Sequence, residues 1–157
     1  MRRADKQITD IEVLNEILDK SHLCRLGLVD NGEAYIIPVN FAHSGGIIYI
    51  HSAPKGRKIK IIKTCKRVSF EMELDYSIIK SDIPCGWTEQ YRSLTGKGTI
   101  EIETDPAAKK KGLDLIMRKY GADMELNYDE NILSRMVILK LSIETVTGKQ
   151  SGYQQID

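Results

Sequence analysis

The amino-acid sequence predicts a mainly β protein, a small antiparallel barrel of six or seven strands decorated by two or three helices. Three observations predict it: short segments with alternating apolar residues, turn residues between most of them, and few stretches with helical periodicity. The chain has 157 residues, 41% of them hydrophobic, which is enough for one domain over residues 1–157 with an ordinary core.

The first part of the chain indicates one helix and a three-stranded meander. Thr9 or Asp10 suits the N-cap of the helix, because apolar residues at helical spacing follow them. Asn31-Gly32 suits a tight hairpin turn, since both positions tolerate positive φ. Pro38 cannot donate a ladder hydrogen bond, so its strand is expected to lie at an edge or to bend there. The meander strands are expected over residues 23–29, 34–41 and from residue 47.

The second part indicates further strands around a long helix. Residues 67–74 alternate apolar and polar side chains, whereas residues 75–89 indicate a looser segment. This segment holds Trp87, either as a plug over the barrel end or as an aromatic wall beside a planar ligand. Asp105-Pro106 caps and begins a helix whose lysines Lys109 to Lys111 are expected to face solvent. A short helix is expected at 130–134 and strands at 91–102 and 136–143, with 144–150 extending the last strand or crossing an edge.

Charge and cysteine content argue against several classes of function. The chain has 23 basic and 22 acidic residues, a balance that does not favour nucleic acid as a partner. No apolar run is long enough to span a bilayer and the first residues are polar, so a cytoplasmic protein without a membrane partner is expected. Cys24, Cys65 and Cys85 are interpreted as reduced structural thiols, with a reactive thiolate at Cys65 as the alternative. His22 and His43 lack partners at metal-ligand spacing, so no metal site is predicted.

The most informative stretch is residues 47–58, where a buried strand passes through a Pro/Gly turn into a basic helix. Gly56, Arg57 and Lys58 fall at the helix N-terminus, where cations oppose the helix dipole unless an anion lies between them. A helix N-terminus also offers free backbone N–H groups, so the pattern predicts a phosphate site. A solvated helix face is the alternative, because such charge runs are common. The cations of this stretch and the helix after it are Lys55, Arg57, Lys58, Lys60 and Lys63.

Four motifs, in this order, resemble the pyridoxamine 5′-phosphate oxidase-like FMN-binding split barrels, and most of all their nitroimidazole-resistance branch. The motifs are Tyr35-Ile36-Ile37-Pro38-Val39-Asn40-Phe41, Tyr49-Ile50-His51-Ser52-Ala53 with Gly56-Arg57-Lys58, Val68-Ser69-Phe70-Glu71, and Tyr91-Arg92-Ser93-Leu94 with Gly96 and Gly98. The opening Arg2-Arg3 followed by Ile8-Thr9-Asp10 also resembles that branch. The likeness therefore covers nearly the whole chain.

The resemblance implies a homodimer with two flavins at the subunit interface, the flavin being FMN or FAD. It implies that Pro38, Val39, Asn40 and Phe41 lie along the isoalloxazine ring, and that His51, Ser52 and Ala53 lie beside the ring and the ribityl chain. It puts Lys55, Gly56, Arg57 and Lys58 nearest the phosphate and Trp87 over the ring. The strand with Tyr91, Arg92 and Ser93 would approach the site from one subunit or the other.

The implied function is a flavin-dependent oxidoreductase that reduces a small planar acceptor such as a nitro-aromatic compound. His51 is the candidate catalytic residue, as proton donor or substrate contact; the alternative is a histidine hydrogen-bonded beside the cofactor. The alternative function is a flavin- or haem-binding split barrel without turnover. Residues 151–157 lack a basic cluster comparable to the one with which true pyridoxamine-phosphate oxidases clamp their substrate, so that activity is not expected.

Overall fold

The computed structural model describes residues 3–153 of the chain; residues 1–2, including Arg2, and residues 154–157, the end of the C-terminal tail, lie outside the described range. The strands are β1 (Gln7–Ile8), β2 (Cys24–Asp30), β3 (Glu33–Val39), β4 (Ala42–Ser44), β5 (Ile47–Ser52), β6 (Arg67–Ile79), β7 (Thr88–Glu103) and β8 (Val137–Ser151). The helices are α1 (Ile11–Lys20), α2 (Arg57–Thr64), α3 (Pro106–Lys119) and α4 (Glu130–Ser134), with 3₁₀ turns at Ala4–Lys6 and Pro84–Gly86.

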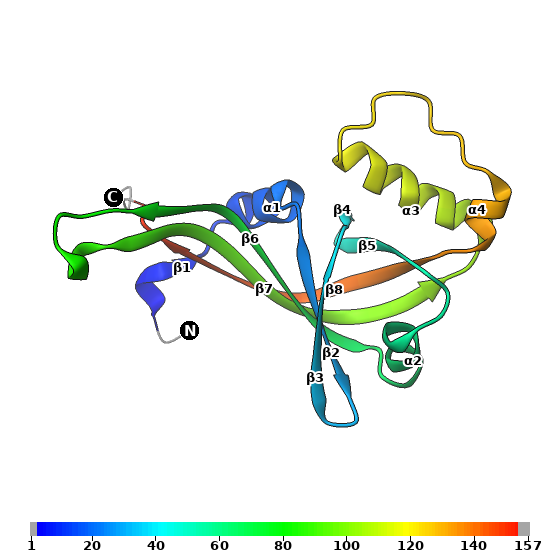
Figure 1. Cartoon of the computed structure of the whole chain (residues 1–157), viewed down its shortest axis with the longest axis horizontal. Helices are drawn as coiled ribbons and strands as arrows, with labels where there is room; N and C mark the ends of the chain where they lie inside the picture. Colours follow the sequence, from blue (N-terminus) through cyan, green and yellow to red (C-terminus); the bar gives the residue numbers. More distant parts are fainter. Residues whose placement is uncertain (1–2, 154–157) are drawn as a thin grey trace.

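All eight described strands belong to one antiparallel sheet (Figure 1). Seven follow the order β3-β2-β6-β7-β8-β5-β4, and β1 pairs with the far end of β8. The two ends of this path, β3 and β4, are joined by residues 40 and 41 alone, so the sheet curls into a barrel that does not close. The predicted mainly β barrel is confirmed, with the very short strands β1 and β4 bringing the strand number to eight.

In the first part of the chain, the turn, the helix cap and the edge strand form where the sequence predicts them. Asn31 and Gly32 have φ of 52° and 86°, which gives the tight turn between β2 and β3. Asp10, and not Thr9, caps α1, because its carboxylate accepts a 2.8 Å hydrogen bond from the Glu12 N–H. Pro38 lies in β3, which is an edge strand of the sheet.

The expectation of a looser segment over residues 75–89 holds for residues 80–87 and is wrong at both ends. β6 continues to Ile79 and β7 begins at Thr88, so the two strands form a long hairpin that projects from the barrel (Figure 1). The pairing register shifts between Leu74 and Ser77, and Asp75 has a φ of 60° at this bulge. An aspartate is a poor strand residue, and it hides the continuity of β6 in the sequence. Residues 76–87 are called the arm below.

Two apolar cores lie on opposite sides of the sheet. The larger core fills the barrel interior with strand side chains such as Leu26 and Met72, and with Ile17 of α1 and Ile62 of α2. The smaller core lies between α3 and the outer faces of β5 and β8. β5 and β8 are thus covered on both faces. This packing fixes the position of the turn that joins the end of β5 to α2. The buried members of the smaller core are Ala42, Tyr49, Leu113, Ile116 and Ile138.

The expectation that Lys109 faces solvent is also wrong. The side chain of Lys109 is buried, and its ammonium donates to the Leu133 carbonyl and, at 3.1 Å, to the Met136 carbonyl. These carbonyls lie at the C-terminal end of α4 and just before β8, where backbone acceptors need a donor. Lys109 therefore joins α3 to the chain that leads into the last strand, through partners 24 and 27 residues further on.

Close packing of β7 on β8 depends on Gly98. The β7–β8 register shifts between Lys97 and Gly98. A Cβ at position 98 would overlap the Ser142 carbonyl oxygen and lie 2.9 Å from Leu141 Cδ2. Only glycine lets the two strands approach this closely where they bend.

Gly98→Ala is expected to lower the free energy of unfolding by about 2 kcal/mol, since the added methyl group must displace backbone that is already packed. Gly27→Ala is the matched control, because a Cβ there would meet its nearest atom, the Ser69 carbonyl oxygen, at an ordinary 3.5 Å. Urea unfolding of the two variants measures the difference. Equal stability of the two variants would contradict the close approach at Gly98.

Candidate functional site

The turn between β5 and α2 builds a helix start with no acidic residue. Gly56 precedes α2 with a φ of 118°, a conformation that favours glycine. As N-cap it offers no side chain to the first-turn N–H groups, which therefore point to an acceptor outside the helix. Arg57 and Lys58 follow in the first turn. The predicted site for a phosphate is thus formed locally, with backbone donors and cations together.

Lys58 is the half-buried cation of this helix start, whereas Lys55 and Lys60 are exposed. Its side chain is half-buried, and within residues 3–153 it makes no hydrogen bond or ion pair. Loss of water lowers the pKa of its ammonium group, because burial disfavours the charged form. A bound anion would compensate for this loss, so the residue fits a phosphate at the helix start.

Arg57 has a different role in the structure. Its Nε donates to Asp30 Oδ2 at 2.7 Å, and its guanidinium carbon lies 4.5 Å from the centre of the Tyr35 ring. The hydrogen bond with Asp30 raises the pKa of the guanidinium. Because Asp30 ends β2 and Tyr35 lies in β3, Arg57 ties the β2–β3 hairpin to the start of α2. Arg57 therefore positions the helix start, whereas the ammonium group of Lys58 remains available to bind a ligand.

The segment from β3 to β4 alternates between core and surface. Val39 and Phe41 are buried, whereas Pro38 and Asn40 are exposed. Two contacts hold Phe41 in place: its N–H donates to the Tyr120 hydroxyl at 3.2 Å, and the Lys119 ammonium lies 3.4 Å from its ring centre. The exposed pair Pro38 and Asn40 is consequently free to contact a ligand at the point where the sheet stays open.

The end of β5 leads directly into this site. His51 is exposed on β5, and within the described residues its ring makes no hydrogen bond. Ser52 is buried and its hydroxyl donates to the Ala53 carbonyl at 3.1 Å. Ala53 and Lys55 are exposed in the turn before Gly56. The residues predicted along β5 and in the turn therefore lie in one continuous segment with the helix start.

The remaining predicted residues lie elsewhere in the chain. Trp87 is at the end of the arm, and Figure 1 shows the arm and α2 at opposite ends of the molecule. The interpretation of Trp87 as a plug over the barrel end is wrong, because its side chain is 50% exposed on this projecting hairpin. Tyr91 and Ser93 follow on β7, where Lys149 lies 5.6 Å from the Tyr91 ring centre. Within one chain, these residues are not brought to the helix start.

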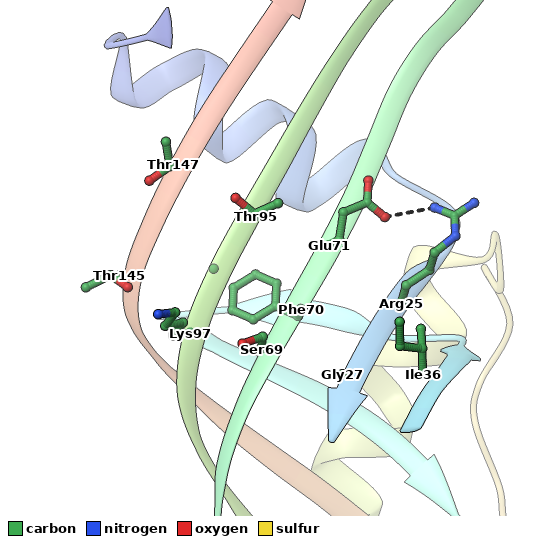
Figure 2. A pocket seen from close by; sticks show the side chains of 11 residues that line it. Arg25, Gly27, Ile36, Ser69, Phe70, Glu71, Thr95, Lys97, Thr145 and Thr147 are labelled. Atoms are coloured by element: carbon green, nitrogen blue, oxygen red, sulfur yellow. Dashed lines mark hydrogen bonds and ion pairs between the residues drawn. The ribbon is translucent and has the colours of Figure 1, made fainter. Parts of the chain in front are cut away.

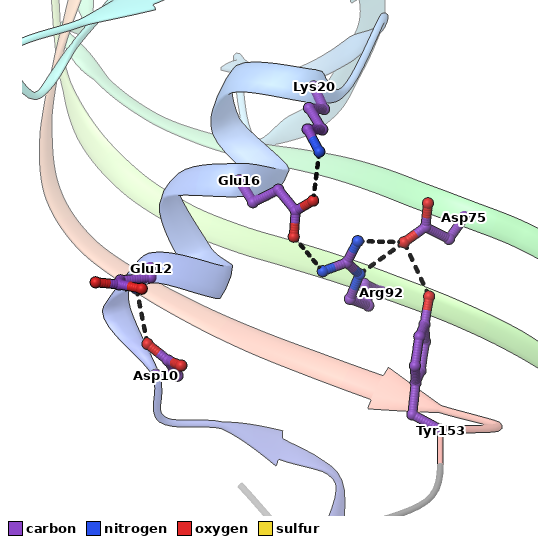
Figure 3. A network of polar contacts seen from close by, with 7 residues as sticks. All are labelled: Asp10, Glu12, Glu16, Lys20, Asp75, Arg92 and Tyr153. Atoms are coloured by element: carbon purple, nitrogen blue, oxygen red, sulfur yellow. Dashed lines mark hydrogen bonds and ion pairs between the residues drawn. The ribbon is translucent and has the colours of Figure 1, made fainter.

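Arg92 is engaged in an ion-pair network between α1 and the base of the arm (Figure 3). Its side chain is 14% exposed and donates to Glu16 at 2.5 Å and to Asp75 at 2.7 Å. Asp75 also accepts from the Tyr153 hydroxyl, and Glu16 from Lys20. The hydrogen bond from Arg92 is the main cause that lowers the pKa of Glu16 to about 2. The guanidinium is therefore committed to protein carboxylates.

A pocket of about 470 Å³ lies on the outer face of the sheet, and the sequence did not predict it (Figure 2). It crosses five neighbouring strands, where small or short side chains leave the sheet uncovered. Ile36, which is 66% exposed, and the Arg25–Glu71 ion pair of 2.9 Å border it. A run of small residues at alternate strand positions is the sequence signal for such a face. The lining residues are Arg25, Gly27, Ile36, Ser69, Phe70, Glu71, Thr95, Gly96, Lys97, Thr145 and Thr147.

The three cysteines are free thiols in different environments. Cys24 is buried, Cys65 is partly buried and Cys85 is exposed. Burial raises the pKa of Cys24 to about 12, which keeps it a neutral thiol. His43 Nδ1 lies 2.9 Å from an Asp19 carboxylate oxygen, and Tyr120 donates to the His22 carbonyl. No helix within residues 3–153 has the length and apolar character needed to cross a bilayer.

The unclosed antiparallel barrel puts the chain in the class of split-barrel proteins. The chain belongs to the pyridoxamine 5′-phosphate oxidase family, whose model matches residues 10–150. A comparison with curated proteins finds no match. The resemblance predicted from the sequence motifs is confirmed, including its nitroimidazole-resistance branch, by this match and by the first of the solved structures described next.

Three solved structures illustrate the likeness. A candidate 5-nitroimidazole antibiotic resistance protein from Bacteroides thetaiotaomicron has a TM-score of 0.83 and 26% identity, over 92% of this chain and 86% of that chain. A flavocytochrome from Azotobacter vinelandii has a TM-score of 0.82 and 20% identity, over 100% and 74% of the two chains. A FAD and haem binding protein from Mycobacterium smegmatis has a TM-score of 0.81 and 23% identity, over 97% and 76%. The last two show the fold alone.

Arg92→Ala is expected to lower the free energy of unfolding by about 2 kcal/mol, less than for a fully buried pair because water reaches Glu16 and Asp75. Arg25→Ala is the matched control: Arg25 also pairs with two carboxylates, but it is 40% exposed and should cost less than about 1 kcal/mol.

The pH dependence gives a second check on Arg92. The pKa of Glu16 falls from an ordinary 4.5 to about 2, so the Arg92 contribution is present above pH 4.5 and is lost as the pH falls towards 2. The stability difference between the native protein and Arg92→Ala, measured by urea unfolding, should therefore shrink over this range. A difference that stays constant down to pH 2 would exclude the network as its source.

Proposed function

We propose that this protein binds a flavin at the start of α2, as a homodimer, and uses it to reduce a small planar acceptor. The observation that carries the proposal is Lys58, a half-buried cation beside a glycine-capped helix start that makes no hydrogen bond or ion pair with any described residue. Membership of the pyridoxamine 5′-phosphate oxidase family supports it. So does the likeness to proteins described as a candidate nitroimidazole resistance protein, a flavocytochrome, and a FAD and haem binding protein.

The residues of the site have separate tasks in this proposal. Lys58 and the first N–H groups of α2 bind the flavin phosphate, while Arg57 keeps the helix start in place through Asp30. Pro38 and Asn40 offer exposed surface to the flavin ring. A bound flavin supplies the electrons or hydride. His51, which is exposed and makes no hydrogen bond among the described residues, donates a proton to the reduced acceptor.

The outer face of the sheet is proposed as the surface on which two copies meet. It combines the pocket of about 470 Å³ with exposed apolar side chains such as Ile36 and Val29, the latter 55% exposed. Small residues such as Ser69 and Gly96 let a second sheet approach closely. Exposed apolar surface of this kind on a folded sheet is typical of an interface.

The first test is the absorption spectrum of the purified protein, with identification of any released small molecule. A flavin spectrum, release of FMN or FAD, and reoxidation of the reduced protein by a nitro-aromatic compound are the expected results. Reduced flavin that passes no electrons to nitro or quinone acceptors would favour a binding protein without turnover. A haem Soret band without flavin would favour the haem-binding alternative, and a colourless protein that refuses added flavin would overturn the proposal.

Lys58→Ala should weaken FMN binding about tenfold to a hundredfold, the usual effect of losing one charge-assisted hydrogen bond. Riboflavin, which lacks the phosphate, should bind the native protein and the variant equally. Lys60→Ala is the matched control, since Lys60 lies two residues further along α2 and is exposed. Titration of flavin fluorescence measures the affinity of each of these three proteins for FMN and for riboflavin. An equal effect on riboflavin, or an equal loss in Lys60→Ala, would argue against a phosphate at Lys58.

A further inference from the structure

A small cavity lies where the C-terminal end of α1, strand β4 and helix α3 meet. Its volume is about 270 Å³, which leaves room for a molecule of a few heavy atoms. Ala42 and Leu115 give it an apolar wall, and the other lining side chains are Asp19, His43 and Lys119. An amine, an imidazole and a carboxylate therefore line one confined space, and none of them belongs to the helix start of α2.

The nitrogen of Lys119 has a fixed place at the wall of this cavity. It donates to the Leu18 carbonyl at 3.1 Å and lies 3.4 Å from the centre of the Phe41 ring. Leu18 lies in the last turn of α1, where backbone carbonyls lack partners within the helix. Among residues 3–153, this is the one hydrogen bond that Lys119 makes. One N–H of Lys119 is thus committed to the helix end, and the rest of the nitrogen is open to a ligand.

Burial makes Lys119 a nucleophile near neutral pH. Loss of water around its half-buried side chain lowers the pKa of the ammonium group from an ordinary 10.5 to about 8. The Asp19 carboxylate raises this pKa, but less than burial lowers it, and the buried Cys24 thiol stays neutral. At a pH of about 8, roughly half of the side chains are therefore free amine, the form whose lone pair can attack a carbonyl carbon.

Asp19 and His43 supply a proton acceptor at the same cavity. His43 Nδ1 lies 2.9 Å from Asp19 Oδ1, and since a carboxylate only accepts hydrogen bonds, Nδ1 carries the hydrogen. Nε2 of the neutral ring then keeps a free lone pair, and it makes no hydrogen bond with any described residue. The His43 side chain is 13% exposed, so the imidazole is enclosed. A histidine oriented by a carboxylate is the usual means of moving protons to and from a nucleophile.

The cavity suits a small uncharged aldehyde. The Asp19 carboxylate disfavours an anion, and the ammonium form of Lys119 disfavours a cation. An acyl donor would have to fit its leaving group as well, whereas an aldehyde releases only water when it condenses with an amine. The limited volume therefore favours the aldehyde.

We propose that Lys119 is a covalent binding site for small uncharged aldehydes, with His43 moving the protons and Asp19 orienting His43. The amine nitrogen attacks the carbonyl carbon and a C–N bond forms, while His43 passes a proton from the nitrogen to the carbonyl oxygen. The second N–H proton follows, the C–O bond breaks, and the oxygen leaves as water. Amine and aldehyde thus give an imine and water, with no oxidant or reductant.

Competition between the lysines of the native protein tests the site. The protein is treated at a pH of about 7.5 with a limiting amount of propanal and with cyanoborohydride, which reduces each imine to a stable amine, and mass spectrometry of peptides locates the label. Lys111 is the matched control, because it lies on the same helix and is exposed. We expect Lys119 to be labelled at least about tenfold faster, since more of it is free amine.

The ratio of the two labelling rates should fall as the pH rises towards about 10, because ordinary lysines then become free amines too. Equal labelling of Lys119 and Lys111 at the lower pH would overturn the inference and leave Lys119 as a structural contact of Leu18 and Phe41. This comparison uses the native protein, so it decides the site even where a variant fails to fold.

Two variants test the separate parts of the site. Lys119→Arg keeps a cation near Leu18 but forms no imine, so the fast first adduct seen in the intact mass should disappear. A fast adduct that persists in Lys119→Arg would place the reaction at another residue and overturn the inference. His43→Gln cannot carry a proton and should slow labelling of Lys119 at least about tenfold, with Lys111 unaffected. An unchanged rate at Lys119 would overturn the part assigned to His43.

Discussion

The long ladder of β6, β7 and β8 is the constraint on which the rest of the structure depends. The same three strands build the barrel at one end and reach far beyond it at the other. This requires a bend without loss of pairing, and the structure supplies it at Gly98, where β7 lies against the backbone of β8, and at the bulge after Leu74. The ladder also sets the distance between the basic helix start and the arm, so it decides which groups of one chain can act together.

The start of α2 keeps a net positive charge that the carboxylates of the protein only partly neutralise. Cations in the first turn of α2 oppose the helix dipole, which costs stability. The protein offsets part of this cost at Arg57, through Asp30 and Tyr35, and leaves Lys58 half-buried with no partner among residues 3–153. If both cations had carboxylate partners, an anion would have to displace them. Pairing one cation and leaving the other free gives a rigid site that still has net positive charge.

Features that depend on neighbouring residues could be predicted from the sequence, whereas those that depend on distant residues could not. The Asn31-Gly32 turn, the cap at Asp105 and the basic helix start each arise within a few residues. The outer pocket combines alternate positions of five strands, and the Arg92 network joins Glu16, Asp75 and Tyr153, so neither leaves a local pattern. The arm was missed for a local reason: Asp75, with its positive φ, interrupts the alternation that marks a strand.

The network around Arg92 explains how the arm keeps a fixed direction without a core of its own. A hairpin that exposes Ile78, Ile83 and Trp87 gains little from its own core, and an isolated two-stranded hairpin is only marginally stable in water. The arm is nevertheless fixed at its base, where the partly buried guanidinium of Arg92 holds Asp75 at the bulge and Glu16 on α1. A rigid base with an uncovered apolar end suits contact with a surface outside the chain, because binding then requires little further ordering of the arm. Arg92, which the family resemblance placed near the cofactor, is therefore seen in this structure to fix the direction of the arm.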